Sequence, residues 1–262
     1  MKSLSIAATG MLAQQRNVEV ISNNIANLNT VGFKRQRAEF QDLFYQTLER
    51  PGAVSSATGA IIPNGVQIGT GVKTGSVYRI VEQGNVTQTG NDFDLAVSGR
   101  GLFRIELPDG TEAYTRAGNF SVSGDGRIVT QDGHELSPGF SVPEDAVDIT
   151  VSEDGVVEAR IAGEEDAREI GRLELVTFFN ESGLEAIGDN LLLETTASGE
   201  PVTGNPGEPG FGRILQGFIE NSNVDPVQEI TALIAAQRAY EMNARVIETS
   251  DEMLAQNANL RR

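Results

Sequence analysis

The chain has 262 residues, of which 39% are hydrophobic, and a formal net charge of −17 at pH 7. This content predicts a globular protein with one large or two modest cores. So acidic a body repels phosphate backbones, which makes nucleic acid a poor partner. The absence of cysteine excludes disulfides and thiolate metal sites. No apolar run has the length of a membrane span, and residues 14–16, QQR, interrupt the N-terminal apolar stretch, so we expect no cleaved signal peptide.

The first expected element is a helix over residues 3–27. Its apolar positions recur in heptads, an arrangement typical of a coiled-coil seam: Leu4, Met11, Val18 and Ile25, alternating with Ala7, Gln14, Ile21 and Leu28. Alanine and glutamine make this seam too soft for a stable isolated dimer. Ile6, Leu12 and Val20 lie off the seam, and apolar side chains on several faces need several neighbours. The pattern therefore predicts a helix that packs in an assembly.

A second, short helix is expected over residues 35–49, because Phe40, Leu43, Phe44 and Leu48 have helical spacing before Pro51. Residues 51–75 are rich in Gly, Ser, Thr, Ala and Pro, which predicts an extended loop or hairpin. This segment contains four aliphatic residues with too few partners of their own: Ile61, Ile62, Val66 and Ile68.

The region from Ser76 to about Gly217 is expected to be β structure. Short apolar or alternating runs such as DLAVSG, LFRIEL and GVVEARI are separated by DG and SG turns. No amphipathic helix separates these runs, so a parallel α/β arrangement is disfavoured. A mostly antiparallel body follows from this pattern.

The last expected element is a helix that begins after NSNVDP, which supplies an N-cap and a proline for the first turn. Its heptad positions are Ile230, Gln237 and Ala244, alternating with Leu233, Tyr240, Ile247 and Leu254, while Ile234, Val246 and Met253 lie off the seam. We therefore predict an α+β fold in which the terminal helices (1–30 and 221–262) form a coiled-coil-like layer. Between them we expect a short helix and extended insertion (31–75) and a β body (76–220) of one or two subdomains.

Candidate catalytic chemistry lacks the necessary residues. The single histidine, His134, follows a DG turn and has no partners at the spacing of a metal or Ser-His-Asp site. Residues 98–101, SGRG, lack the Lys-Ser/Thr of a phosphate loop, and a glycine turn or bulge entering a strand explains them better. We assign no catalytic, cofactor-binding or metal-binding residue and expect no cofactor, no small-molecule substrate and no enzymatic activity.

Three long segments resemble the rod and hook proteins of the bacterial flagellum. They are SNNIANLNTVGFKRQRAEFQDLFYQT (22–47), SGRGLFRIELPDGTEAYTRAGNFSVSGDGRIVTQDGHEL (98–136) and ENSNVDPVQEITALIAAQRAYEMNARVI (220–247). The resemblance covers nearly the whole chain. Its length and the segment after residue 35 are most similar to the distal-rod members of that family, with proximal-rod and hook members as the alternatives.

This resemblance implies a structural subunit of the distal rod, a rigid hollow shaft that carries torque from the motor to the hook across the periplasm. The terminal helices would form the inner layer of the tube, through an interface of Leu4, Met11, Val18, Ile21, Ile25, Leu28, Ile230, Leu233, Tyr240, Ile247 and Leu254. The implied partners are further copies of the chain, proximal rod proteins, the hook protein, the ring proteins around the rod and the flagellar type III export apparatus. Phe40 and Phe44 fit the family's export-gate pattern, with ordinary packing of an amphipathic helix as the alternative explanation. Because the four aliphatic residues of the 51–75 segment lack partners of their own, we expect them to reach onto a neighbouring subunit and stiffen the rod.

Two features keep alternative interpretations open. The asparagines 23, 24, 27 and 29 either end the first helix or form an inter-subunit hydrogen-bond cluster. Thr115 and Arg116 either contact a neighbouring subunit or form a surface ion pair. Two rival classes of protein explain the sequence less well. A secreted β-rich binding module leaves the multi-faced terminal helices unexplained, and a cell-wall hydrolase should have a metal cluster or nucleophile.

Overall fold

The computed structural model describes residues 2–49, 64–143, 145–161 and 167–259. The chain divides into two compact units. The first, here called the helical unit, comprises Met1–Ile25, Gln36–Tyr78 and Pro226–Arg262. The second, here called the β body, comprises Ala26–Arg35 and Arg79–Asp225. Terminal helices flank a mostly antiparallel β region, so the predicted α+β class is confirmed.

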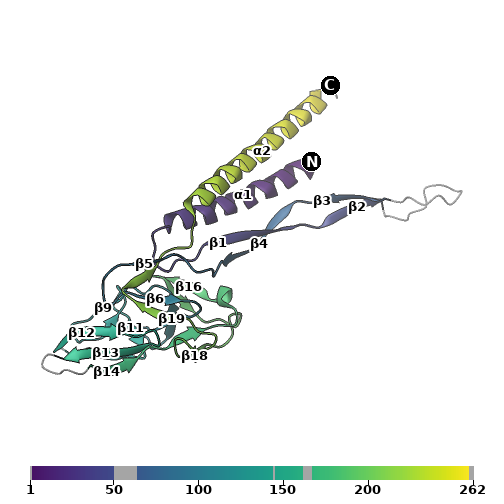
Figure 1. Cartoon of the computed structure of the whole chain (residues 1–262). Helices are drawn as coiled ribbons and strands as arrows, with labels where there is room; N and C mark the ends of the chain where they lie inside the picture. Colours follow the sequence, from purple (N-terminus) through teal and green to yellow (C-terminus); the bar gives the residue numbers. More distant parts are fainter. Residues whose placement is uncertain (1, 50–63, 144, 162–166, 260–262) are drawn as a thin grey trace. The chain divides into compact units, whose positions relative to one another are not determined.

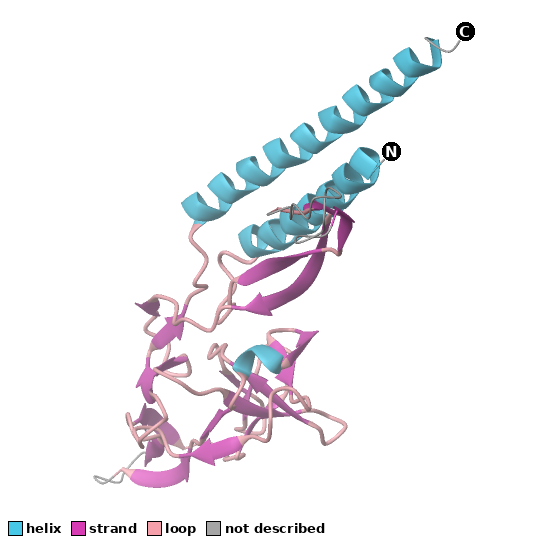
Figure 2. Cartoon of the chain, turned by 90° about the vertical axis from the view of Figure 1, so that its right-hand side faces the viewer, coloured by secondary structure: helices cyan, strands magenta, loops and turns pink. Residues whose placement is uncertain are grey.

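Two long helices come from opposite ends of the chain: α1 (Lys2–Ala26) and α2 (Pro226–Asn259). They lie side by side and run in opposite directions, as both views show (Figures 1 and 2). Pro226 stands at the first position of α2, where its missing N–H leaves no helical hydrogen bond unmade, and no proline interrupts α1. Neither helix, over the residues described, is long and apolar enough to cross a membrane.

The segment after α1 forms strands rather than the expected short helix. β1 (Gln36–Asp42) pairs with β4 (Val72–Arg79), and β2 (Tyr45–Glu49) pairs antiparallel with β3 (Val66–Gly69). The prediction of a helix over residues 35–49 is therefore wrong. Phe40, Phe44 and Leu48 are four residues apart, and because four is also a multiple of two, the same spacing fits one face of an extended chain.

The 51–75 segment agrees with the hairpin alternative where it is described. β3 returns along β2 with Tyr45 opposite Gly69 and Gln46 opposite Ile68. Backbone hydrogen bonds from Leu43 N to Gly71 O (2.8 Å) and from Thr70 N to Phe44 O (3.1 Å) continue the pairing toward β4. Ile61 and Ile62 lie outside the described residues.

The largest sheet of the β body has seven strands in the order β16-β17-β8-β7-β11-β10-β9, and every neighbouring pair is antiparallel. Its strands are β7 (Phe103–Glu106), β8 (Glu112–Thr115), β9 (Ser121–Val122), β10 (Ile128–Val129), β11 (Glu135–Ser137), β16 (Glu185–Gly188) and β17 (Leu191–Leu193). Short turns join most neighbours, which confirms the antiparallel prediction.

Smaller sheets complete the β body. A three-stranded sheet contains β12 (Ala146–Val151), β13 (Val156–Ile161) and β14 (Arg168–Arg172). Three antiparallel pairs join β15 (Leu175–Thr177) to β18 (Val202–Gly204), β19 (Arg213–Gln216) to β6 (Leu95–Ser98), and β20 (Phe218–Glu220) to β5 (Val86–Gln88). One 3₁₀ turn, η1, spans Glu181–Gly183.

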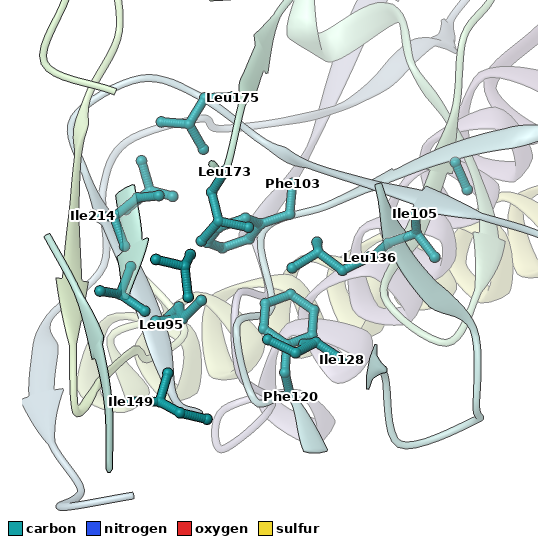
Figure 3. Close-up of a cluster of buried hydrophobic side chains, with 14 of the residues drawn as sticks. Leu95, Phe103, Ile105, Phe120, Ile128, Leu136, Ile149, Leu173, Leu175 and Ile214 are labelled. Atoms are coloured by element: carbon teal, nitrogen blue, oxygen red, sulfur yellow. The ribbon is translucent and has the colours of Figure 1, made fainter. Parts of the chain in front are cut away.

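The core of the β body follows from the two-residue alternation of its strands. Phe103 and Ile105 of β7 point to the main hydrophobic cluster, which Figure 3 shows, and Phe103 packs edge to face on Phe120 with ring centroids 5.2 Å apart. On the other face Leu102 joins a smaller cluster, where Tyr114 packs on Phe178 at 4.8 Å. Apolar side chains therefore pack on both faces of the sheet around Phe103 and Tyr114.

Candidate assembly surface

The seam between α1 and α2 is made of small and polar side chains. Ser250 Oγ donates a hydrogen bond to Ser3 Oγ at 3.3 Å, and a Cβ added to Gly10 would lie 2.9 Å from Nδ2 of Asn243. At the other end of the seam, Asn24 Nδ2 donates to Glu229 Oε2 at 3.1 Å. The contacts advance by heptads along both helices in opposite directions. The helices therefore approach closely where their side chains are smallest.

This seam differs from the predicted one by one residue at half of its positions. The predicted positions Leu4, Met11, Val18 and Ile25 are half-buried, and the closest contacts come from Ser3, Gly10 and Asn24, each one residue earlier. On α2, Ile230 and Gln237 are exposed, whereas Glu229 and Ala236 are buried. A heptad pattern places apolar residues in the seam, but a close approach selects small residues, so the pairing of α1 with α2 has a different phase at these positions.

The remaining predicted interface residues occupy several environments. Ile21 is buried on α1, and Leu28 is half-buried just beyond the helix. On α2, Leu233 and Ile247 are half-buried, while Tyr240 and Leu254 are exposed. The structure therefore brings part of the predicted set into the subunit itself and leaves the rest open.

Large apolar side chains remain exposed on the helical unit. On α2 they are the following set, which we call the α2 stripe: Val227, Ile230, Ile234, Tyr240, Met242, Val246, Met253 and Leu254. Ile230 is 51% exposed, and Leu12 on α1 is 66% exposed. Exposed patches of this kind are typical of interaction surfaces. The sequence pattern singles out Ile234, Val246 and Met253 as apolar residues off the seam, but not Val227 and Met242.

A groove of about 390 Å³ opens beside α1 within the helical unit, lined by Thr9, Leu12, Arg16, Leu43, Val72 and Lys73 among others. One wall is α1, and the other is formed by the residue after β1 and by the start of β4. Val72 N donates to Thr9 Oγ1 at 3.3 Å, which joins the two walls at one end. The helical unit thus carries an apolar stripe and a separate groove.

The asparagines after position 22 have different roles. Asn24 is buried, where its Nδ2 donates to Gln36 O at 2.8 Å and its Oδ1 accepts from Gln36 N at 2.8 Å. Asn27 Oδ1 accepts a hydrogen bond from Thr30 Oγ1 at 3.0 Å, in the turn that follows α1. Asn27 thus fits the interpretation of helix termination, whereas Asn24 forms hydrogen bonds within the subunit rather than between subunits.

The predicted export-gate pair and the aliphatic residues of the 51–75 segment lie on strands or between them where they are described. Phe40 is half-buried in β1, and Phe44, between β1 and β2, is 89% exposed. Ordinary packing of an amphipathic helix, the alternative explanation for this pair, is ruled out because the segment is extended. Val66 and Ile68 are exposed on β3, where no described side chain covers them fully.

Thr115 and Arg116 are buried, so the predicted surface location of this pair is wrong, although Arg116 does form an ion pair. Arg116 is 7% exposed, and its Nε lies 2.5 Å from Oε2 of Glu220, which is also buried. Thr115 Oγ1 donates to Asn190 O at 2.9 Å. Sequence reasoning missed Glu220. The available signal was a carboxylate within the short strand of residues 218–220, where alternation would favour an apolar residue.

His134 and the SGRG turn lie in backbone turns. Gly133 N donates to Thr130 O at 3.0 Å and Thr130 N to His134 O at 2.8 Å, so His134 lies in the expected turn. Gly99 and Gly101 have positive φ angles of 108° and 140°, as expected of a glycine turn entering β7. No group of three His, Asp or Glu side chains is placed to hold a metal ion within the described part of the chain.

Three sequence families match this chain in three separate regions. Residues 4–34 match the flagella basal body rod protein family, residues 96–159 match the flagellar hook protein FlgE/F/G D1 domain, and residues 215–260 match the flagellar basal body rod FlgEFG protein C-terminal family. The first and last of these regions contain much of α1 and α2. The middle region lies in the β body.

Full-length relatives refine this match. The flagellar basal-body rod protein FlgG of Caulobacter vibrioides is 60% identical over 261 residues, covering 100% of both chains. The chain belongs to the FlgG family. The FlgG protein of Agrobacterium fabrum is 53% identical and covers 97% of both chains. By contrast, the FlgF protein of Caulobacter vibrioides is only 35% identical over 96% of this chain and 94% of its own.

The prediction of a flagellar rod protein is confirmed by membership of the FlgG family. Among solved structures, the flagellar hook protein FlgE2 of Helicobacter pylori matches with a TM-score of 0.26 and 16% identity, covering 71% of this chain and 43% of that one. A score this low carries no argument about the fold.

Proposed function

We propose that this chain is a structural subunit of the flagellar distal rod that polymerises through its terminal helices. Its full-length relatives are named as flagellar basal-body rod proteins, which supports this role. The observation that carries the proposal is the α2 stripe, whose large apolar side chains are exposed in the part of the chain that the structure describes. Assembly with further copies would bury them and supply the missing hydrophobic free energy.

The geometry suits an open filament. The α2 stripe and the groove beside α1 are different surfaces of the same unit, so contact between them on two copies is heterologous. A heterologous contact that does not close into a ring repeats as a helix. The predicted interface residues exposed on α2, namely Ile230, Tyr240 and Leu254, belong to this surface in our proposal, and the half-buried ones position the helices behind it.

The proposal also covers the location, the partners and the export of the subunit. In it, the rod crosses the periplasm and transmits torque, contacting proximal rod proteins, the hook protein and the surrounding ring proteins. The subunit is exported through the flagellar type III apparatus, and exposed Phe44 with Phe40 serves as the export-gate signal. The exposed β2–β3 hairpin, with Val66 and Ile68, stiffens the rod by contact with a neighbour.

A matched pair of variants tests the assembly surface. Ile234→Glu places a carboxylate in the α2 stripe, and Gln237→Glu adds the same charge at an exposed polar position one turn away. A carboxylate buried without a partner costs several kcal/mol, and the cost recurs in every subunit. We expect concentrated parent and Gln237→Glu protein to form tubes in electron micrographs and Ile234→Glu to remain monomeric. Tubes from Ile234→Glu at the parental concentration would contradict the proposal.

A further inference from the structure

The chain passes between the two units four times, between residues 25 and 26, 35 and 36, 78 and 79, and 225 and 226. The backbone therefore connects the β body to the helical unit only at these four points. Within the β body, a group of buried and half-buried polar side chains lies on the segments that begin or end at these points. We call Lys34, Arg116, Glu220 and Asn223 the root cluster.

Glu220 is the centre of the root cluster. Its Oε1 accepts hydrogen bonds from Lys34 Nζ at 2.5 Å and from Gly84 N at 2.9 Å, and its Oε2 accepts from Arg116 Nε at 2.5 Å. Its own backbone O accepts from Gly32 N at 2.8 Å. One carboxylate thus joins the segment that follows α1, the segment that follows β4 and the strand that leads to α2.

Arg116 connects this carboxylate to the base of the β body. Its Nη1 donates to Gly101 O at 2.5 Å, and its Nη2 donates to Val97 O at 2.6 Å and Gly99 O at 2.7 Å. The positive φ angles of Gly99 and Gly101 belong to the turn that presents these carbonyls. The SGRG turn (98–101) and Arg116 are therefore parts of one hydrogen-bonded site.

Asn223 joins the same segments a second time. Its Oδ1 accepts from Arg35 N at 2.7 Å, and its Nδ2 donates to Ile80 O at 3.0 Å and Glu82 O at 2.9 Å. Lys34 Nζ also donates to Glu82 O at 2.9 Å. Residues 34–35, 80–82 and 223, which lie within a few positions of three of the chain crossings, are held together by side-chain bonds.

We propose that the root cluster is the joint through which the subunit transmits torque, an inference that rests on the proposed role as a rod subunit. Burying ion pairs is costly, and well-packed apolar residues often give equal or greater stability, so stability alone does not account for this cluster. Hydrogen bonds to charged groups are directional, whereas hydrophobic contact is not. Directional bonds keep the joined segments from sliding under force, which a shaft subunit requires.

Purified full-length monomer and living cells give separate tests. Glu220→Gln removes the central charge while keeping the shape, and Glu153→Gln, which breaks the exposed Arg213–Glu153 pair, is the matched control. In Glu220→Gln monomer we expect amide exchange to become at least tenfold faster in residues 30–35, 79–86 and 217–224, with β7 unchanged. Cells carrying this variant should assemble rods in normal number but lose swimming speed more steeply than the parent as the viscosity rises.

Two further variants keep the test decisive. If Glu220→Gln does not fold, Lys34→Gln removes the more exposed cation and leaves the Arg116–Glu220 pair, and the same changes are expected in milder form. The chain has no cysteine, so Phe218→Cys with Gln88→Cys adds a single disulfide between β20 and β5. Added to Glu220→Gln, this pair should restore slow amide exchange only when the disulfide is oxidised.

The outcomes separate this inference from the proposed function. Exchange that rises equally in β7 would mean that the cluster stabilises the whole β body, and swimming that depends on viscosity as in the parent would mean that it carries no torque. Either result overturns the inference and leaves the rod assignment standing. Absence of tubes from the parent protein would overturn the rod assignment, while the exchange measurement on monomer would still report on the joint.

Discussion

Asn24 of α1 and Glu229 of α2 meet inside the helical unit, where Asn24 Nδ2 lies 3.1 Å from Glu229 Oε2. Both side chains are buried, and they are 205 positions apart in the sequence. The same asparagine binds both backbone groups of Gln36, so one side chain joins the end of α1, the start of α2 and the start of β1. This contact sets the register of the seam at its polar end.

Asn24→Ala should weaken assembly without changing the β body. The change removes the bonds that this side chain makes to the Gln36 backbone and the Glu229 carboxylate, at a cost of about 1–3 kcal/mol for a buried polar group. We expect the concentration needed for tube formation to rise roughly 5- to 150-fold, since about 1.4 kcal/mol is a factor of ten. Sedimentation of tubes over a concentration series measures it. Ser22→Ala, at an exposed position on α1, should leave this concentration unchanged.

Gly10 and Asn243 should show strong coupling. Gly10→Leu forces α1 away from α2 because even a Cβ would lie 2.9 Å from Asn243 Nδ2, so we expect tubes to be lost. Asn243→Ala removes the obstructing amide, and the double variant should recover part of the assembly. A double-mutant cycle on the tube-forming concentration measures the coupling. Additive effects would show that the two residues are not in contact in the tube.

The helices of dilute monomer should exchange their amides rapidly. A seam of serine, glycine and asparagine buries little apolar area, and the ordering of two long helices costs conformational entropy. We expect residues 4–28 and 230–254 to exchange much faster than β7 in monomer and slowly in tubes. Strong protection of both helices in dilute monomer would contradict this prediction.

The β2–β3 hairpin can be tested by charge. Leu48→Asp with Ile68→Asp alters two exposed apolar residues of the hairpin, so we expect a folded, assembling subunit whose rods bend or vary in length. Thr47→Asp with Gln67→Asp, a cross-strand pair at exposed positions, is the matched control. Basal bodies imaged by electron microscopy decide between the two. Straight rods of regular length from the first variant would make the hairpin a passive linker.

Acidification should remove the contribution of Glu220. Burial alone would raise the pKa of Glu220, but the charges of Arg116 and Lys34 and the hydrogen bonds from Lys34 and Gly84 hold its pKa below the ordinary value of 4.5. A carboxyl group with a lowered folded pKa stabilises the fold above its unfolded pKa, and this stability is lost as the pH falls through the folded pKa. The difference in unfolding free energy between parent and Glu220→Gln should therefore be largest near neutral pH and shrink below about pH 4.5. Urea titrations over this range measure it, and a difference independent of pH would contradict the ionised state.

The terminal helices and most strands could be predicted because their apolar patterns are local. The phase of the seam could not, since Gly10 and Ser3 mark a close approach only when a partner is present. The prediction of a helix over residues 35–49 failed because its spacing suited a strand equally well. The root cluster joins residues that are 186 and 104 positions apart, and no periodicity in one sequence links such positions.

The contact between Ser3 and Ser250 spans 247 positions, nearly the full length of the chain. A chain broken or prematurely terminated before α2 keeps α1 but lacks its partner, however well its β body folds. Such a fragment cannot present the paired surface that a growing polymer would recognise. In the proposed assembly, only full-length molecules carry both terminal helices, so only they can join the polymer.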